Sequence, residues 1–165
     1  MRKLFGVGVA LLLLLAVAGL AAAGGNGNYS VHLNGDTEVP ANASKATGQA
    51  IFHVSKDGTS LECKLIVAKL DNPVAAHIHL GPPGVNGPVV ALLFSGAPGG
   101  GTVNGVLAES TITNLVGPLA GQPLSALIDA LNSGNAYVNV HTNDGVPPAG
   151  TGPGDLPGGE IRGNF

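Results

Sequence analysis

The stretch QAIFHVSKDGTSLECKLIV, residues 49–67, decides the fold class. Apolar residues occupy every second position on either side of Asp57-Gly58: Ala50, Phe52 and Val54 before it, and Leu61, Cys63, Leu65 and Val67 after it. A period of two is typical of a β-strand with one buried face. Asp-Gly readily adopts the positive φ angles of a tight turn. The stretch therefore predicts a β-hairpin.

Similar short runs follow along the chain, separated by Gly, Pro, Asn and Asp. They predict strands around residues 29–33, 49–55, 61–67, 74–80, 89–94, 102–112, 136–142 and 159–165. One helix is expected after Pro123, because Leu124, Leu127, Ile128 and Leu131 share a helical face and Gly134 can end it. Eight strands with one short helix predict an all-β domain, a Greek-key β-sandwich of the immunoglobulin-like type.

The N-terminus has the pattern of a secretory signal. Met1-Arg2-Lys3 is cationic, the next twenty residues to Ala23 carry no charge, and the segment closes on three alanines. Its length also suits an uncleaved membrane anchor, which needs about 20 apolar residues, but the interspersed glycines and the alanine-rich end favour cleavage. We expect a signal peptide at residues 1–23, a mature domain at 24–165 and a secreted or periplasmic location, with membrane attachment only if the segment is retained.

Composition excludes several classes of function. Seven Lys and Arg against ten Asp and Glu give a net charge of −3, and removal of Arg2 and Lys3 leaves five cations against ten acids, a net −5. Such a chain builds no basic surface for nucleic acid. The single cysteine, Cys63, excludes an internal disulfide and a thiolate-rich zinc site. No nucleophile elbow, phosphate-binding loop or His-Glu-x-x-His motif is present, so a non-enzymatic protein is favoured.

Five ordered segments together resemble the chordin-type domain, or CHRD domain: LNGDTEVP (33–40), AHIHLG (76–81), GVNGP (84–88), NAYVNVHT (135–142) and GEIRG (159–163). The likeness runs from about Tyr29 to Phe165. It implies an extracellular β-sandwich module, and for single-domain members of the family it implies no settled biochemical activity.

A weaker resemblance is to copper–zinc superoxide dismutases, whose order of motifs is His-x-His, then Val-x-His, then a glycine-rich segment with an arginine. It implies a superoxide-dismutase-like sandwich with His77, His79 and His141 at copper-ligand positions and Arg162 at the anion-guiding position. This chain has no histidine between His79 and His141. The bridging and zinc histidines of the dismutases are therefore missing, as is their disulfide.

The three histidines also form a candidate site by strand geometry alone. His77 and His79 share one strand face, and His141 lies on the face of its strand opposite Val138 and Val140. If the two strands meet, three imidazoles converge on the outer surface of the sheet, beneath the loops. Three neutral imidazoles suit copper, zinc or nickel and leave a position open for water or substrate. The structural alternative is that they hydrogen-bond the backbone of the Gly/Pro-rich loops.

Glu160 and Arg162 also share a face, expected to point outward. In the functional interpretation, Arg162 orients an anion, and Glu160 either holds Arg162 in place or acts as a fourth metal ligand. In the structural interpretation, the two residues form an exposed ion pair that contributes about 0–1 kcal/mol to stability. The sequence thus favours a secreted CHRD-type module that binds an extracellular protein or envelope component through the loops at 81–88 and 143–158. This module would also carry a single copper or zinc ion if His77, His79 and His141 act as ligands. The alternative is a copper-dependent oxidoreductase of the dismutase type.

Overall fold

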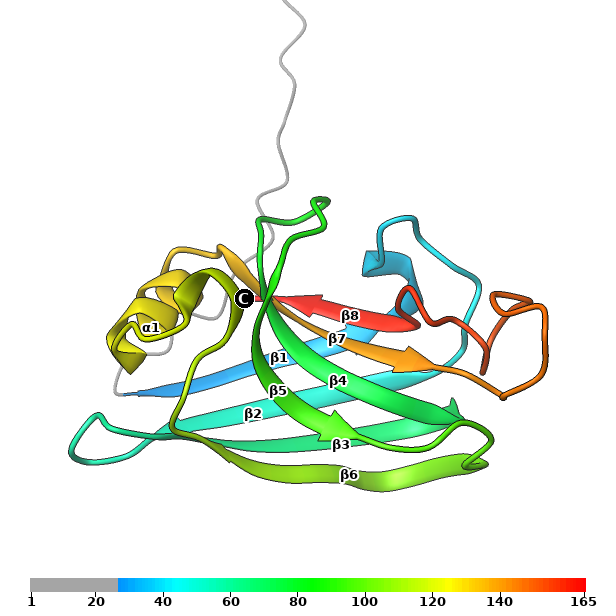
Figure 1. Ribbon diagram of the computed structural model, residues 1–165, viewed down its shortest axis with the longest axis horizontal. Coiled ribbons are helices and arrows are strands. Elements are labelled where there is room, and N and C mark those ends of the chain that lie inside the picture. Colours follow the sequence, from blue (N-terminus) through cyan, green and yellow to red (C-terminus); the bar gives the residue numbers. More distant parts are fainter. Residues whose placement is uncertain (1–26) are drawn as a thin grey trace, which may run out of the picture.

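A computed structural model of the chain describes residues 27–165, so the expected signal peptide lies outside the described residues. Eight strands and one α-helix make up this part (Figure 1). The strands are β1 (Asn28–Asn34), β2 (Thr47–Val54), β3 (Leu61–Asp71), β4 (Pro73–Leu80), β5 (Val89–Ser95), β6 (Thr102–Ile112), β7 (Ala136–Thr142) and β8 (Ile161–Asn164). The helix α1 spans Leu124–Asn132, and 3-10 turns η1 and η2 span Gly35–Thr37 and Gly117–Leu119. No helix within residues 27–165 is long and apolar enough to cross a membrane.

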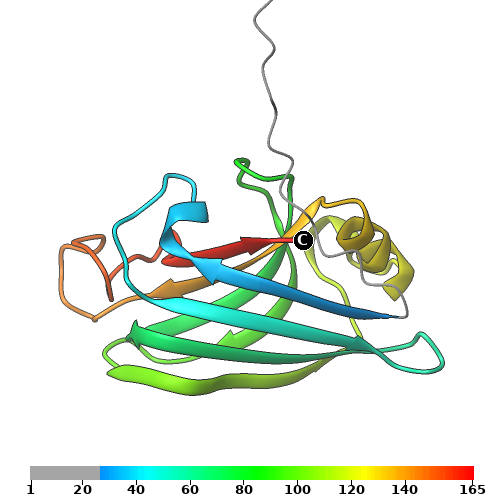
Figure 2. The same cartoon turned by 180° about the vertical axis from the view of Figure 1, so that it is seen from behind.

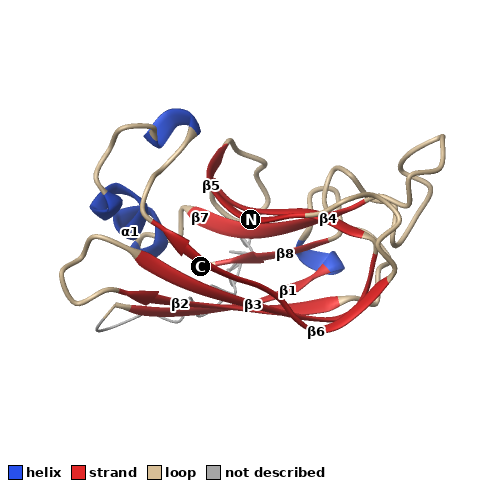
Figure 3. Cartoon of the chain, turned by 60° about the horizontal axis from the view of Figure 1, so that its bottom comes forward, coloured by secondary structure: helices blue, strands red, loops and turns tan. Residues whose placement is uncertain are grey.

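The strands form one antiparallel sheet in the order β5-β4-β7-β8-β1-β2-β3-β6. Figure 3 shows how it curls: β5, β4, β7 and β8 form one layer over β1, β2, β3 and β6. The layers join where β1 pairs with β8 through the single register pair Asn34↔Arg162, and β5 approaches β6 on the opposite side. The predicted all-β sandwich with one short helix is confirmed, with a nearly closed, barrel-like form.

The core between the layers is apolar and follows the predicted alternation. Phe52 of β2, Leu65 of β3 and Ile78 of β4 are fully buried. The hairpin of β2 and β3 closes as expected, with Gly58 at φ +70° and Phe52 opposite Cys63. The predicted helix is also observed, preceded by Pro123 and followed by Gly134 at φ +70°.

The outer face of β4, β7 and β8 is covered as well, although its side chains are polar. The loops at 35–46, 81–88 and 143–160 rise on this side of the sheet (Figures 1 and 2). They hold one another: Asn86 Nδ2 donates to the Val39 carbonyl at 2.8 Å, and Ser44 Oγ donates to Glu160 Oε1 at 2.6 Å. These strands and loops carry the buried polar residues Glu38, His79, Asn139, Thr142, Asp155, Glu160 and Arg162. The domain thus has a polar interior beneath its loops in addition to the apolar core.

Candidate metal centre

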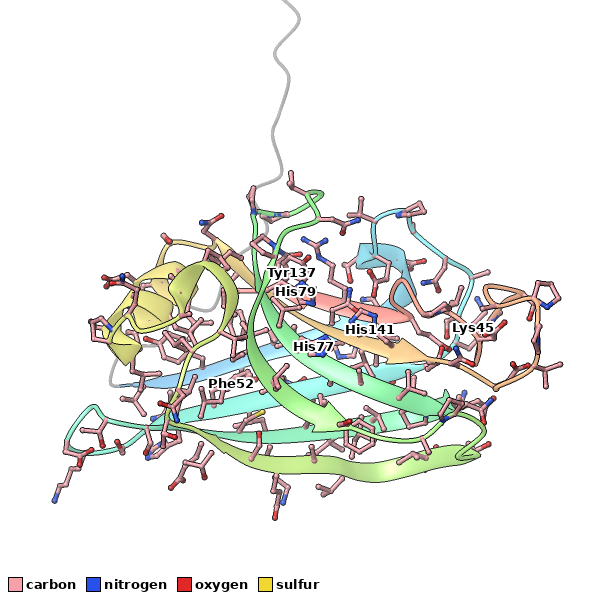
Figure 4. All side chains as sticks on the ribbon, in the orientation of Figure 1. Lys45, Phe52, His77, His79, Tyr137 and His141 are labelled. Carbon is pink, nitrogen blue, oxygen red and sulfur yellow. The ribbon has the colours of Figure 1, made fainter. Side chains whose placement is uncertain are left out.

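Three histidines meet on this covered face. β4 pairs with β7, with Ala75 opposite His141 and His77 opposite Asn139, so the two strands place His77, His79 and His141 on one face. One ring nitrogen from each lies within 4.8 Å of the others. The labelled side chains in Figure 4 show the three rings gathered beside Tyr137. The predicted convergence of the three rings required that the strands at 74–80 and 136–142 meet. In the structure these strands, β4 and β7, are direct neighbours.

Backbone carbonyls of the loops orient two of the rings. His79 Nδ1 lies 2.9 Å from the Gly87 oxygen, and His141 Nδ1 lies 3.0 Å from the Pro157 oxygen. A carbonyl only accepts, so each Nδ1 carries the proton, and in the neutral ring Nε2 keeps a free lone pair. His79 Nε2 is buried and has no hydrogen-bond partner among residues 27–165. These contacts are the loop-backbone hydrogen bonds that the structural alternative predicted for His79 and His141. A carbonyl at the second nitrogen is also the usual partner of a metal-ligating imidazole.

The remaining contact joins two of the histidines. His77 Nδ1 lies 3.2 Å from His141 Nε2. Since His141 Nε2 has the lone pair, His77 donates this hydrogen bond in the metal-free protein. With its proton on Nε2 instead, His77 would offer the lone pair of Nδ1, and an ion between the rings would have three nitrogen lone pairs available.

Burial keeps the three rings neutral. It lowers the pKa of His77 to about 4, with the neighbouring charges of His141 and then His79 adding to the effect. Burial also lowers the pKa of His79 and of His141, partly offset by their hydrogen bonds to the Gly87 and Pro157 carbonyls. At neutral pH each ring is therefore uncharged, with one nitrogen protonated and the other keeping its lone pair.

The three histidines could together hold a metal ion. The donor set consists of three imidazole nitrogens, and within residues 27–165 no other group of three or more metal-ligating side chains comes together. Imidazole suits zinc, copper and nickel, and three protein ligands leave one position of a tetrahedral ion open. The other two histidines, His32 and His53, are exposed and lie outside the cluster.

Arg162 lies on the outer face of β8 as expected, but the expectation that it is exposed is wrong, because the loop at 81–88 covers it completely. Its guanidinium donates to Asn86 Oδ1, to the carbonyls of Pro82 and Val85, and to Asn164 Oδ1. It also lies over the ring of Tyr137, 3.5 Å from the centroid. Since β7 lies between β4 and β8, Tyr137 separates Arg162 from His79. Arg162 is not placed to meet an anion at the histidines.

The expected ion pair of Glu160 with Arg162 is also wrong. Glu160 is fully buried and accepts from Ser44 Oγ and Thr142 Oγ1 and from the Gly154 amide. Across residues 27–165 the one ion pair is Lys64–Glu109, at 2.9 Å on the surface. Both Glu160 oxygens are engaged and neither belongs to the histidine cluster, so Glu160 is not a fourth ligand. Both errors have one cause: loops cover the face expected to be exposed.

Sequence reasoning missed Glu38, Asn139 and the role of Tyr137. Glu38 is only 6% exposed, and burial raises its pKa to about 7. Asn139 Nδ2 donates to Glu38 Oε2 at 3.3 Å, whereas Glu38 Oε1 and Asn139 Oδ1 are buried without partners. Asn139 alternates with Tyr137 and His141 along β7, which is a signal for the shared face. No pattern in the sequence indicates that Glu38 lies over this face of β7.

Fold and site together define an all-β sandwich domain with a loop-covered histidine cluster on its outer face. The chain matches the CHRD domain family model over residues 29–151 and belongs to the CHRD domain family. The match ends before β8, so the segment at 159–163 lies beyond it. No curated protein and no solved structure matches the chain. The likeness to the dismutases therefore rests on the order of a few motifs alone.

Proposed function

We propose that this CHRD domain protein is an exported, non-enzymatic module that binds a single copper or zinc ion through His77, His79 and His141. The observation that carries the proposal is the meeting of three neutral imidazoles whose nitrogens lie within 4.8 Å, one of them a buried Nε2 without a partner. A buried polar atom without a partner costs free energy. A metal ion at this point would remove that cost for His79.

An ion here would connect four parts of the domain. His77 and His79 come from β4 and His141 from β7, while Gly87 and Pro157, which orient two of the rings, come from two different loops. The bound metal would therefore stabilise the covering loops as well as the sheet. Any ligand bound to the folded protein alone raises its stability according to its free concentration and dissociation constant.

The test is metal analysis of the protein purified from its native compartment, repeated on His79→Ala and His141→Ala. The exposed histidines offer matched controls, since His32→Ala and His53→Ala remove an imidazole of the same type outside the cluster. We expect one equivalent of metal in the wild type and in both controls, and its loss in both cluster variants. Equal metal content in all five proteins would return the histidines to a purely structural role.

The alternative is a copper-dependent oxidoreductase of the dismutase type. Its support is a donor set of three imidazoles with room for a further ligand. Against it stand the buried position of Arg162 behind Tyr137 and the net charge of −5 expected for the mature chain, which repels anions. A superoxide assay on copper-loaded protein decides between them. Activity no greater than that of free copper ion, or unchanged in His77→Ala, removes the alternative.

Export and partner binding belong to the same proposal. The charge pattern of residues 1–23 supports export, and the exposed loop tips at 82–86 and 145–151 offer a contact surface for an extracellular protein or envelope component. Mass spectrometry of the secreted protein should find a mature N-terminus near Gly24. If shortening both loops leaves partner capture by the tagged protein intact, these loops are not the contact surface.

A further inference from the structure

The loop at 81–88 is fastened to the sheet mainly by one side chain. Arg162 of β8 donates to Asn86 Oδ1 at 3.1 Å and to the carbonyls of Pro82 and Val85 at 3.2 and 2.9 Å. The side chain is fully buried and forms no ion pair with a carboxylate of residues 27–165, although burying a cation is costly without compensation. The guanidinium instead presents its fork of donors to three acceptors of the loop. It fixes the path of the loop.

That path brings the Gly87 carbonyl to His79. Gly87 can occupy its position only as glycine, because a Cβ there would lie 1.5 Å from the Leu80 carbonyl oxygen. The Gly87 amide donates to Tyr137 Oη at 3.0 Å, and its carbonyl accepts from His79 Nδ1 at 2.9 Å. The loop residue that selects the tautomer of His79 is thus held by Tyr137 and, further along the loop, by Arg162.

Tyr137 also touches His79 directly. The two rings stack with their centroids 4.8 Å apart and an angle of 10° between their planes. The Arg162 guanidinium lies 3.5 Å from the centroid of the same tyrosine ring, on the β8 side. A cation over an aromatic face is attracted by the quadrupole of the ring. His79, Tyr137 and Arg162 therefore form a stack across β4, β7 and β8.

We infer that Tyr137 and Arg162 are positioning residues for His79: the stack fixes the plane of its imidazole, and the loop carbonyl that they hold in place directs its Nε2 lone pair toward the metal position. The inference deepens the proposed function and rests on it for its metal readouts. It assigns Arg162 a role different from anion guidance, because the guanidinium reaches His79 only indirectly, through the Tyr137 ring and through the loop that carries the Gly87 carbonyl.

The first measurement needs no metal. In the metal-free protein, ¹⁵N NMR shifts of the imidazole report which nitrogen carries the proton. We expect His79 to be a single Nδ1–H tautomer in the wild type and a mixture in Tyr137→Leu, which removes both the stack and the hydroxyl. Tyr137→Phe keeps the stack and loses only the hydroxyl contacts, so it should lie between the two.

The second measurement is Cu(II) binding by competition with a chelator, together with the electron paramagnetic resonance spectrum. Partners that orient a metal ligand typically contribute 10–100-fold to metal affinity, so Tyr137→Leu should weaken Cu(II) binding by about that factor and change the spectrum. Rescue by Tyr137→Phe of most of the affinity would separate the stack from the hydroxyl. A role in stability alone would leave the copper spectrum unchanged.

If the substitutions of the buried Tyr137 prevent folding, Asn86→Ala provides a second test of the inference. Asn86 is exposed, but its side chain joins Arg162 to the loop and the loop to Val39. We expect a mixed His79 tautomer and a several-fold loss of Cu(II) affinity, with no change in Asn114→Ala, an exposed asparagine on another loop. A wild-type tautomer and wild-type copper binding in Asn86→Ala and in every folded Tyr137 variant would overturn the inference. If the wild-type protein binds no copper, but His79 changes from a single tautomer to a mixture in Tyr137→Leu, the metal proposal is refuted while the positioning of His79 by Tyr137 is supported.

Discussion

Replacement of Glu38 by glutamine should stabilise the protein at alkaline pH and not at acid pH. Glu38 is 6% exposed, and its burial raises its pKa to about 7. The hydrogen bond from the Val39 amide, the charge of Arg162 and the Asn139 amide offset only part of this effect. The folded protein therefore binds this proton more tightly than the unfolded chain, whose glutamate has the ordinary pKa of 4.5.

The difference between the folded and unfolded pKa of Glu38 sets the direction and the magnitude of the change in stability with pH. Because the folded pKa is raised, stability is greatest below pH 4.5, falls as the pH rises to about 7 and stays low above it. One pKa unit corresponds to about 1.4 kcal/mol, so the ionised side chain costs the fold about 3 kcal/mol at pH 8. Glutamine removes the charge, and its amide can donate to Asn139 Oδ1, which has no partner. We expect a gain of about 1–3 kcal/mol at pH 8 and a change below about 0.5 kcal/mol at pH 4.

Urea unfolding of wild type and Glu38→Gln at both pH values, with a chelator present, measures the effect. Comparison at equal pH cancels the contribution of the histidines, which both proteins share. Glu62→Gln serves as control, because Glu62 is an exposed glutamate of β3 and its replacement should change stability by less than about 0.5 kcal/mol at either pH. The reasoning is refuted if Glu38→Gln is less stable than wild type at pH 8, or if its effect is the same at both pH values.

Three further outcomes test other parts of the structure. The pKa of His77 is lowered to about 4, so the unfolded chain takes up this proton first and the contribution of His77 to stability is lost as pH falls from about 6.5 to 4. Because Glu38 acts in the opposite direction over this range, the test uses the metal-free Glu38→Gln protein: its free energy of unfolding in urea should be lower at pH 5 than at pH 7, and equal values would contradict the prediction. Gly87→Ala should lower the free energy of unfolding by about 2 kcal/mol or more, because its Cβ overlaps the Leu80 carbonyl, and a wild-type melting temperature would disprove that close approach. Cys63 is buried and its pKa is raised to about 12, so a thiol reagent should modify it only in denaturant; rapid labelling of the native protein would show the opposite.

Most of the fold could be predicted from local patterns. The strands at 102–112 and 136–142 have the bounds that alternation and turn residues predict, and the hairpin around Gly58 follows from Asp-Gly. Period-two alternation is a local property, since it depends only on which side chains share a face. The shared face of His77 and His79 was predictable for the same reason.

The burial of that face was not predictable. Alternation separates an apolar face from a polar one, but it does not say whether the polar face is exposed to water. Here three loops close over it through contacts between distant residues, such as Asn86 with Val39 and Ser44 with Glu160. The same limitation explains why Arg162 and Glu160 were expected at the surface.

The covered face also explains how a chain with few charges can hold a defined site. Its buried cation and its buried acid Glu160 are each satisfied by neutral partners: carbonyls and amides for Arg162, and hydroxyls and an amide for Glu160. The rings of the cluster come from strands, whereas the carbonyls that set the tautomers of His79 and His141 come from loops. Strands fix where the nitrogens are, and loops fix which nitrogen has the lone pair. A metal ion would therefore bind to a sheet that is already in place, and the structural response to its binding or loss should be concentrated in the loops at 81–88 and 143–160.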